Sequence, residues 1–490
     1  MTTPVRSSIR LVRGLSLVAA ISIVIGNVIG TGVFLKTRVM TCNVDTPGMV
    51  LAVWVAAGLL SLAGALTYAE LAAMMPRAGG EYVFLREAYG PRWGFLYGWM
   101  QIFIAKTGSQ ASVAVAFAIF LNDFTGGAVG GTLLTQNLLG RQFSLTTLQV
   151  IALGAIAVVT LVNCAAVAVS GYVATLLTGV KIALVLGVGI GAFMLTNNGG
   201  WNHFALANQG GTCEGVSDAA RIGLAGFGAA MLGALWGYDG WNNLTLVAGE
   251  VKNPQRNIPL ALIGGTIVII ALYVFINLAY FYVLTPTEVA SVAKSSSVAA
   301  EVAGRFTSPF DGRLLGSVAV SLIAAALMAS SFGTLHTSIL TGARVPYAMS
   351  RDRLFFQNLA RLSPRTHVPV GALILQGVWA GILALSGSFD TLTDYVIFGS
   401  WIFYGLTTAS VFVFRRRMPD AERPYRAWGY PVVPALFLLV TAWLLINTLL
   451  TTPTQALTGL GLILLGLPVY WYWARHNRAN FAEIEDIDES

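Results

Sequence analysis

Residues 25–34 read Ile25-Gly26-Asn27-Val28-Ile29-Gly30-Thr31-Gly32-Val33-Phe34. Three glycines and two polar side chains thus lie near the middle of an apolar run from Leu15 to Leu35. A run of about 20 residues can cross a bilayer as a helix. Glycine weakens a helix by about 1 kcal/mol relative to alanine, so we expect a break here. Gly26 and Gly30 also match a GxxxG pattern, for which close helix packing is the alternative interpretation.

A second stretch has the same character. It lies in the sixth apolar run and reads Leu235-Trp236-Gly237-Tyr238-Asp239-Gly240-Trp241-Asn242-Asn243. Spans one and six would begin two five-helix halves, and transporters built from inverted repeats carry paired, discontinuous helices in such positions. Non-helical backbone at membrane depth is tolerated only where it lines a cavity or is buried in protein. Two breaks in corresponding positions therefore favour a binding site over packing alone.

The rest of the chain is strongly apolar. Of its 490 residues, 56% are hydrophobic and 10% are charged, whereas soluble domains contain about 25% charged residues. The lengths of the apolar runs predict an all-α membrane protein with twelve transmembrane helices. We expect these helices near residues 15–36, 47–75, 93–121, 145–166, 172–195, 222–249, 258–283, 313–345, 370–387, 391–414, 431–451 and 455–474.

The basic residues predict the orientation in the membrane. If the N-terminus is cytoplasmic, twenty of the 29 lysines and arginines lie on the inner side, and the reverse orientation would place these clusters outside. Both termini then face the cytoplasm, which an even number of spans requires. We therefore expect a multi-pass protein of the cytoplasmic membrane, surrounded by membrane lipid. The first apolar run is too long for a cleavable signal peptide and has no small-residue cleavage site.

Several other classes of function are disfavoured. The pI near 9.4 could suggest nucleic acid, but the arginines form short clusters between apolar runs. The sequence has no HExxH, GxSxG or P-loop pattern of an enzyme, and we find no filter loop of a channel. Cys42, Cys164 and Cys213 lack metal-ligand spacing, so no metal or cofactor is expected. Cys42 and Cys213 are expected on the external side, and the sequence leaves a disulfide between them open.

The chemistry of the two breaks suits an α-amino acid. The half-helix that begins at Thr31 and Gly32 would present backbone N–H groups and a positive dipole end, which suit a carboxylate. Glycine also lets a ligand approach the backbone closely. An ammonium group would suit the carbonyls freed at the breaks, those of Val28, Gly30, Trp236 and Gly237.

The chain resembles the amino acid–polyamine–organocation superfamily and, within it, the L-type amino acid transporter group, as a prokaryotic member. The resemblance covers essentially the whole transmembrane region. It rests on Ile29-Gly30-Thr31-Gly32-Val33-Phe34, Pro76-Arg77-Ala78-Gly79-Gly80-Glu81-Tyr82, Tyr238-Asp239-Gly240-Trp241-Asn242, Glu250, Asn253-Pro254, Arg256-Asn257 and Pro259. It implies a LeuT-type fold of two inverted five-helix repeats plus two extra helices. The repeats would be residues 15–195 and 222–414, the extra helices 431–474, and the cytoplasmic ends 1–14 and 475–490.

The resemblance also implies residue roles. Thr31 and Gly32 match the positions that receive the substrate carboxylate, and Trp236 matches an aromatic gate over the substrate. Val28 and Gly30, with Trp236 and Gly237, match positions near the amine. Lys181 matches a lysine that takes the place of sodium in sodium-driven relatives, with the Gly26 carbonyl and a hydroxyl of Ser330 or Ser331 as expected partners.

Three charged residues within the expected spans need an explanation. A lysine at a helix centre costs about 2.5–3.5 kcal/mol on insertion scales, so Lys181 needs a partner and usually has a role. Lys106 in span three is as compatible with a structural anchor as with a gating residue. Asp239 could contact a cationic substrate side chain, or it could cap the following half-helix or make a local hydrogen bond, which we consider the simpler interpretation.

The resemblance implies sodium-independent exchange of neutral, and also cationic, amino acids by alternating access. The alternative is a proton-coupled symporter with Lys181 as the coupling group. Animal members join a heavy chain through a cysteine in the loop after span three. Residues 122–144 contain no cysteine, so we expect no disulfide-linked partner.

Overall fold

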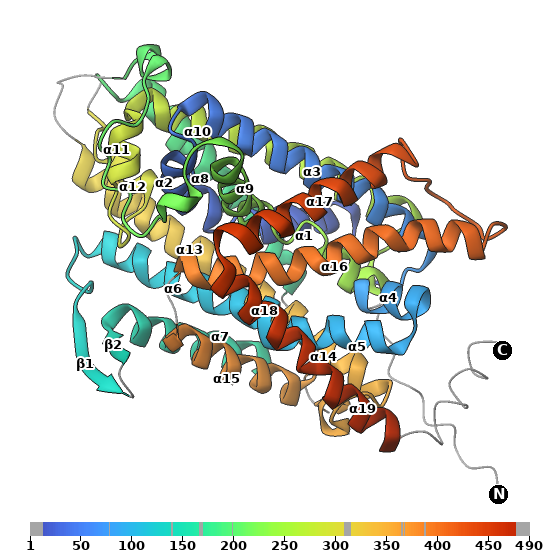
Figure 1. Ribbon diagram of the computed structural model, residues 1–490. Coiled ribbons are helices and arrows are strands. Elements are labelled where there is room, and N and C mark those ends of the chain that lie inside the picture. The colour runs from blue at the N-terminus through green and yellow to red at the C-terminus, as the bar shows by residue number, and fades with distance from the viewer. Residues whose placement is uncertain are drawn as a thin grey trace, which may run out of the picture.

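The computed structural model describes residues 13–77, 79–138, 141–165, 170–197, 199–307, 315–363, 366, 368–386 and 389–476. Helices make up nearly all of the regular structure in these residues, and they pack into one bundle (Figure 1). The sheet that accompanies them has two antiparallel strands, β1 Thr132–Leu138 and β2 Arg141–Thr146. The predicted all-helical class is therefore confirmed for the described residues.

The helices follow one another in two successive groups. The first group is α1 Leu17–Val28, α2 Gly32–Val44, α3 Pro47–Met74, α4 Glu81–Tyr89, α5 Pro91–Met100, the π-helix η1 Gln101–Ala105, α6 Lys106–Phe124, α7 Thr147–Ala165 and α8 Ser170–Met194. The second group is α9 Gly223–Tyr238, the 3₁₀-helix η4 Asn243–Glu250, α10 Pro254–Val283, α11 Pro286–Ser291, α12 Val298–Ala303, α13 Gly316–Gly342, α14 Arg344–Arg351, α15 Val370–Ser386, α16 Phe389–Arg417, α17 Val432–Thr451, α18 Pro453–Leu464 and α19 Gly466–His476.

Nine helices of the described chain are long and apolar enough to cross a membrane. A tenth span is formed by α1 and α2 together, which are bent by 41° at a break. The other two expected spans correspond to α9 and α15, which have 16 and 17 residues, fewer than the about 20 of a straight crossing. One expected boundary is wrong, because the first span ends at Val44 and not near residue 36.

Local sequence explains where several helices begin. The hydroxyl of Thr46 accepts a hydrogen bond from the N–H of Met49, and Pro47 occupies the first turn of α3, where its missing N–H costs nothing. Thr285 and Glu288 form a capping box at the start of α11, so two otherwise unpaired N–H groups are satisfied there. The first of these signals is local, and the expected start of the second span at residue 47 agrees with the start of α3.

Short helices gather at the two ends of the bundle (Figure 1). α11 and α12 lie at the same end as the β1–β2 hairpin, and α4, α14 and α19 lie at the opposite end. α11 and α12 both lie in the connection between α10 and α13. In each group, a short helix follows the second span: α4 follows α3, and α11 follows α10.

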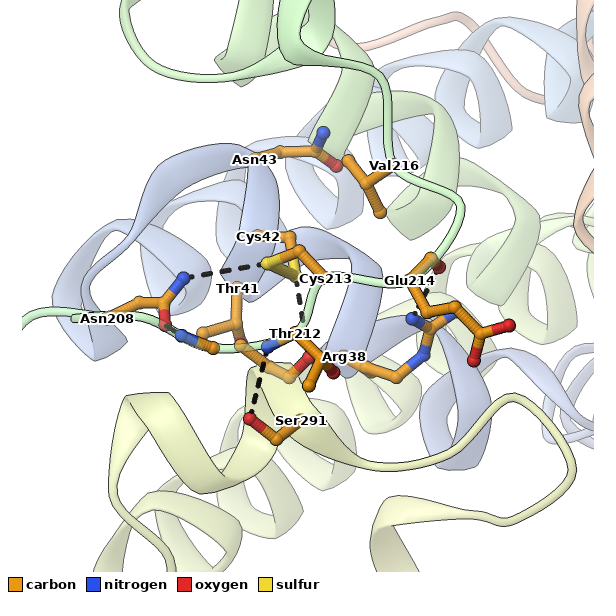
Figure 2. The surroundings of a disulfide bond; sticks show 12 residues. Arg38, Thr41, Cys42, Asn43, Asn208, Thr212, Cys213, Glu214, Val216 and Ser291 are labelled. Carbon is orange, nitrogen blue, oxygen red and sulfur yellow. Dashed lines mark hydrogen bonds between the residues drawn. A yellow bond between two sulfur atoms is a disulfide. The ribbon is translucent and has the colours of Figure 1, made fainter.

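A disulfide joins Cys42 near the end of α2 to Cys213 in the connection between α8 and α9, with Cα atoms 5.6 Å apart (Figure 2). The sequence left this pairing open. Beside it, the guanidinium of Arg38 donates a hydrogen bond of 3.0 Å to the carbonyl of Glu214. Cys42 lies in the last turns of α2, beyond the expected end of the span. The disulfide therefore ties the connection between α8 and α9 to the broken first span.

Candidate functional site

The first break separates α1 from α2. Ile29 follows α1 in an extended conformation, with φ −69° and ψ 91°, and α2 begins at Gly32. Thr31 is the N-cap residue of α2, and its side chain makes no capping hydrogen bond. The N–H groups in the first turn of a helix have no partner within that helix. The start of α2 therefore presents backbone donors midway along the first span, as predicted.

The second break separates α9 from η4. Asp239 follows α9 with φ −58° and ψ 141°, and the next helical segment begins at Asn243. Gly240, between them, has φ +100°, a conformation that residues with a Cβ rarely adopt. A Cβ at this position would also lie 3.2 Å from the Cβ of Asn27 in α1. Both predicted breaks are therefore confirmed.

The two breaks lie against one another. A Cβ on Gly32 would lie 2.5 Å from the Cα of Gly237, so only glycine lets the start of α2 approach the end of α9 this closely. The indole N–H of Trp236 donates a hydrogen bond of 3.4 Å to the hydroxyl of Thr31. Four of the predicted substrate-binding residues, Thr31, Gly32, Trp236 and Gly237, are thus brought together.

Tyr273 of α10 links the two breaks. Its hydroxyl oxygen lies 2.9 Å from the carbonyl oxygen of Val28 and 2.8 Å from that of Gly237, so its one proton serves two acceptors. The expectation that both carbonyls are left for a ligand therefore needs correction, because buried carbonyls freed by a break require partners and Tyr273 supplies one. Sequence reasoning missed Tyr273, and the signal was a phenolic hydroxyl within the apolar seventh span.

Lys181 of α8 joins α1 to α13 and is only 2% exposed. Its ammonium donates hydrogen bonds of 2.6 Å to the carbonyl of Gly26 and of 2.6 Å to the hydroxyl of Thr334. The expected contact with Gly26 is confirmed. The expected contact with Ser330 or Ser331 is wrong: Thr334 lies one turn beyond Ser330 on the same helix face, and the Ser331 hydroxyl bonds to the carbonyl four residues earlier, at 2.8 Å.

A cavity lies beside Lys181. It encloses about 710 Å³, including the part that is open to solvent. Gly26 and Lys181 belong to its lining, whereas the residues of the two breaks, 29–31 and 239–242, do not. The lining also includes Leu15, Glu250 and Arg344. The cavity therefore extends from Lys181 toward the end of the bundle at which α1 begins.

Asp239 and Lys106 take part in contacts at the second break. The hydroxyl of Tyr404 in α16 donates a hydrogen bond of 2.8 Å to Asp239, and the ammonium of Lys106 donates one of 2.6 Å to Asn243. The capping part of the interpretation of Asp239 is wrong, because the segment after the break begins at Asn243 with Asn242 as its N-cap residue. The hydrogen bond from Tyr404 is compatible with the other part, a local hydrogen-bond role. Lys106 anchors α6 to η4, a contact compatible with either role considered for it.

The chemistry at the breaks is that of backbone amides, hydroxyls and single charges. Within the described ranges, no group of three or more His, Cys, Asp and Glu side chains could hold a metal ion. Such groups suit the reversible binding of a small polar ligand. Two broken spans in contact within a bundle of apolar helices define a membrane transporter.

The chain belongs to the amino acid permease family, whose profile matches residues 15–471. It is 30% identical to b(0,+)-type amino acid transporter 1 of Homo sapiens, over 94% of this chain and 88% of that protein. It is 32% identical to the serine/threonine exchanger SteT of Bacillus subtilis (strain 168), over 93% of this chain and 96% of that protein. It is 28% identical to the cystine/glutamate transporter of Homo sapiens, over 96% of this chain and 86% of that protein. The resemblance to the superfamily and its L-type group is confirmed, and the family consists of transporters and not of enzymes.

Proposed function

We propose that this chain is a sodium-independent amino acid exchanger of the cytoplasmic membrane that works by alternating access. The observation that carries the proposal is the contact between the two broken helices, with Gly32 against Gly237. The names of two of these relatives cite different amino acids, serine and threonine for one and cystine and glutamate for the other. The backbone N–H and carbonyl groups at the two breaks suit the carboxylate and ammonium groups that all of these share. We assign neutral amino acids first, and cationic ones as a second group because of Asp239.

The substrate carboxylate is placed at the start of α2, where the first N–H groups and the hydroxyl of Thr31 are available. The ammonium group is placed at the carbonyl of Gly30, because those of Val28 and Gly237 already accept bonds from Tyr273 and that of Trp236 accepts one from the N–H of Asp239. Trp236 would close over the substrate as a gate, and its bond to Thr31 keeps it at this position.

The twelve-span, LeuT-type architecture is part of the same proposal. Residues 15–195 and 222–414 would form the inverted repeats and 431–474 the extra helices. Two features support this: the first helix of each repeat is broken, and a short helix follows the second. The ends 1–14 and 475–490, which we place in the cytoplasm, fall largely outside the described residues.

Lys181 is proposed as the residue that replaces a sodium ion. A fixed ammonium between Gly26 of α1 and Thr334 of α13 holds two helices together as a bound cation would. The cavity beside it extends toward the end of the bundle that we assign to the cytoplasm. We therefore infer an inward-facing state, in which substrate leaves along the cavity.

The test is counterflow in proteoliposomes that contain the purified chain alone, because residues 122–144 offer no cysteine to a heavy chain. Uptake of a radiolabelled neutral amino acid should require unlabelled amino acid inside and should be unchanged when choline replaces sodium. Uptake into empty vesicles that follows an imposed pH gradient would favour the proton-coupled symporter instead. If none of the common amino acids elicits exchange or gradient-driven uptake, the proposal is overturned.

A further inference from the structure

A buried carboxylate lies beside the second break, outside the proposed substrate contacts. Glu81 is the first residue of α4 and is fully buried. One carboxylate oxygen accepts a hydrogen bond from the amide of Asn242, and the other lies 3.4 Å from the hydroxyl of Thr245, whose single proton is shared with the nearer carbonyl of Asn242. A buried carboxylate persists only if it is hydrogen-bonded or paired with a charge. The amide of Asn242, the shared proton of Thr245 and the positive end of α4 contribute to that stabilisation.

Both donors belong to the second break and to the 3₁₀-helix that follows it. Asn242 is the N-cap residue of η4, and the Thr245 hydroxyl lies 2.8 Å from the carbonyl of Asn242. The backbone N–H of Gly79 also donates a hydrogen bond of 3.1 Å to the carbonyl of Leu246 in η4. The segment that leads into α4 therefore holds η4 through its backbone and through the Glu81 side chain.

The contact continues from Glu81 to Asp239. The hydroxyl of Tyr404 lies 3.5 Å from the side-chain oxygen of Asn242 and 2.8 Å from a carboxylate oxygen of Asp239. The Asn242 side chain is thus held by Glu81 through its amide nitrogen, and its oxygen lies beside the Tyr404 hydroxyl, whose proton goes to the nearer carboxylate of Asp239. A displacement of Asn242 would disturb the backbone of the break and the position of Asp239.

The helix that carries Glu81 is itself firmly held. Tyr82 and Arg86 of α4 donate hydrogen bonds of 2.6 and 2.7 Å to Asp352, which directly follows α14. These contacts fix α4 against another part of the bundle. The carboxylate of Glu81 therefore acts from a rigid support.

We propose that Glu81 is a positioning residue for transport, which sets the conformation of the second break and the place of Asp239 through its hydrogen bond with Asn242. The inference rests on the proposed amino acid transport and adds to it a residue that touches no substrate. The proposed hydrogen bond requires a carboxylate at one of the two positions, 81 or 242, and an amide at the other.

The experiment compares Glu81→Gln and Asn242→Asp with the double variant that carries both changes, which exchanges carboxylate and amide between two positions of unchanged side-chain length. The matched control is Glu87→Gln, which removes another carboxylate of α4, one that pairs with Arg86. KM and maximal rate are measured by counterflow and normalised to folded transporter. Each single variant should raise KM about tenfold, because the loss of a hydrogen bond to a charged group weakens an equilibrium by about that factor. The double variant and Glu87→Gln should stay within about threefold of the wild type.

Two results would overturn the proposal. One is an unchanged KM in Glu81→Gln with a rate that falls only with the amount of folded protein, which is what a purely structural residue gives. The other is a double variant whose KM is no lower than that of the single variants, or whose yield of folded protein is as low as theirs. A wild-type protein without amino acid transport would instead overturn the proposed function, so the two failures are distinguishable.

Discussion

The ammonium nitrogen of Lys181 lies 2.6 Å from the carbonyl oxygen of Gly26, two residues before α1 ends at the first break. The same ammonium also bonds to the Thr334 hydroxyl, so one side chain of α8 connects a broken helix to α13. Movement of α1 away from α8 and α13, which alternating access would require, must break at least one of these bonds. The strength of this contact should therefore influence the rate of transport.

Lys181→Ala should lower the rate of counterflow at least about tenfold and leave some substrate binding. The substitution leaves the buried carbonyl of Gly26 without its ammonium donor, at a cost of about 1–3 kcal/mol, whereas the Thr334 hydroxyl keeps its hydrogen bond to the carbonyl of Ser330. Counterflow rates and equilibrium binding of the same radiolabelled amino acid provide the measurement. Lys252→Ala, which removes an exposed lysine before α10, is the control and should keep the wild-type rate. Unchanged kinetics in Lys181→Ala would refute the role of this lysine.

Thr334→Val should slow transport about fivefold or more, because it keeps the shape of the side chain but removes the hydroxyl that Lys181 contacts. Ser331→Ala should change the rate less than about twofold, because its hydroxyl bonds only within its own helix. Initial counterflow rates at saturating substrate separate the two variants. The opposite ranking would mean that Ser331 is the functional partner of Lys181.

Tyr273→Phe should destabilise the protein by about 1–3 kcal/mol and raise KM, because the carbonyls of Val28 and Gly237 lose their shared donor. The ring itself can remain packed against Trp54, whose centroid lies 5.1 Å away. Thermal unfolding of the detergent-purified protein and KM in proteoliposomes test this. Tyr280→Phe is a matched control on α10, since the buried Tyr280 hydroxyl has no hydrogen-bond partner among the residues that the structure describes. Equal effects of the two substitutions would contradict the linking role.

Asp239→Asn should reduce exchange of arginine and lysine about tenfold more than exchange of leucine, if the carboxylate contacts a cationic side chain. The charge on Asp239 lies beside the break and bonds to Tyr404, and removing it weakens a charge-assisted contact with such substrates. A competition panel with a preloaded neutral amino acid measures the ratio. Tyr404→Phe keeps the charge and should keep the preference. An equal loss for leucine would assign Asp239 to the Tyr404 contact alone.

Replacing Cys42 or Cys213 by serine should lower the stability of the protein by about 2–4 kcal/mol, because the bond closes a long loop, with a sequence separation of 171 residues. Thermal unfolding with and without a reducing agent measures the effect. Cys164→Ser, at the one free cysteine of the described chain, should retain both the wild-type stability and the sensitivity to reduction. Titration of three free thiols in unreduced protein would rule the disulfide out.

Much of the site could be predicted because its signals are local. The glycines at positions 26, 30 and 32 and at 237 and 240 interrupt apolar runs, and both breaks occur where these glycines lie. The charge of Lys181 in an apolar span required a polar partner, and one of the two expected partners is present. Local composition reports where a helix fails and where a charge is buried.

Other features could not be predicted, because they depend on which helices meet and at what height. Tyr273 reaches both breaks from α10, and Glu81 reaches the second break from α4. The sequence contains the hydroxyl and the carboxylate but not these distances. An error of one helical turn, about 5.4 Å, in the predicted height of a residue exchanges one hydrogen-bond partner for another. Lys181 illustrates this, because it bonds to Thr334 and not to Ser330, the partner expected one turn earlier.

The sequence by itself determined that the chain is a helical membrane protein whose first and sixth spans are interrupted, because hydrophobic run length and glycine placement act within a single segment. Only the tertiary structure decided which groups meet at those interruptions: Gly32 with Gly237, Lys181 with Thr334, Tyr273 with two carbonyls and Cys42 with Cys213. These contacts join residues that are far apart in the chain. Their partners are selected by how the helices pack, and each buried polar group bonds to whatever that packing places within reach.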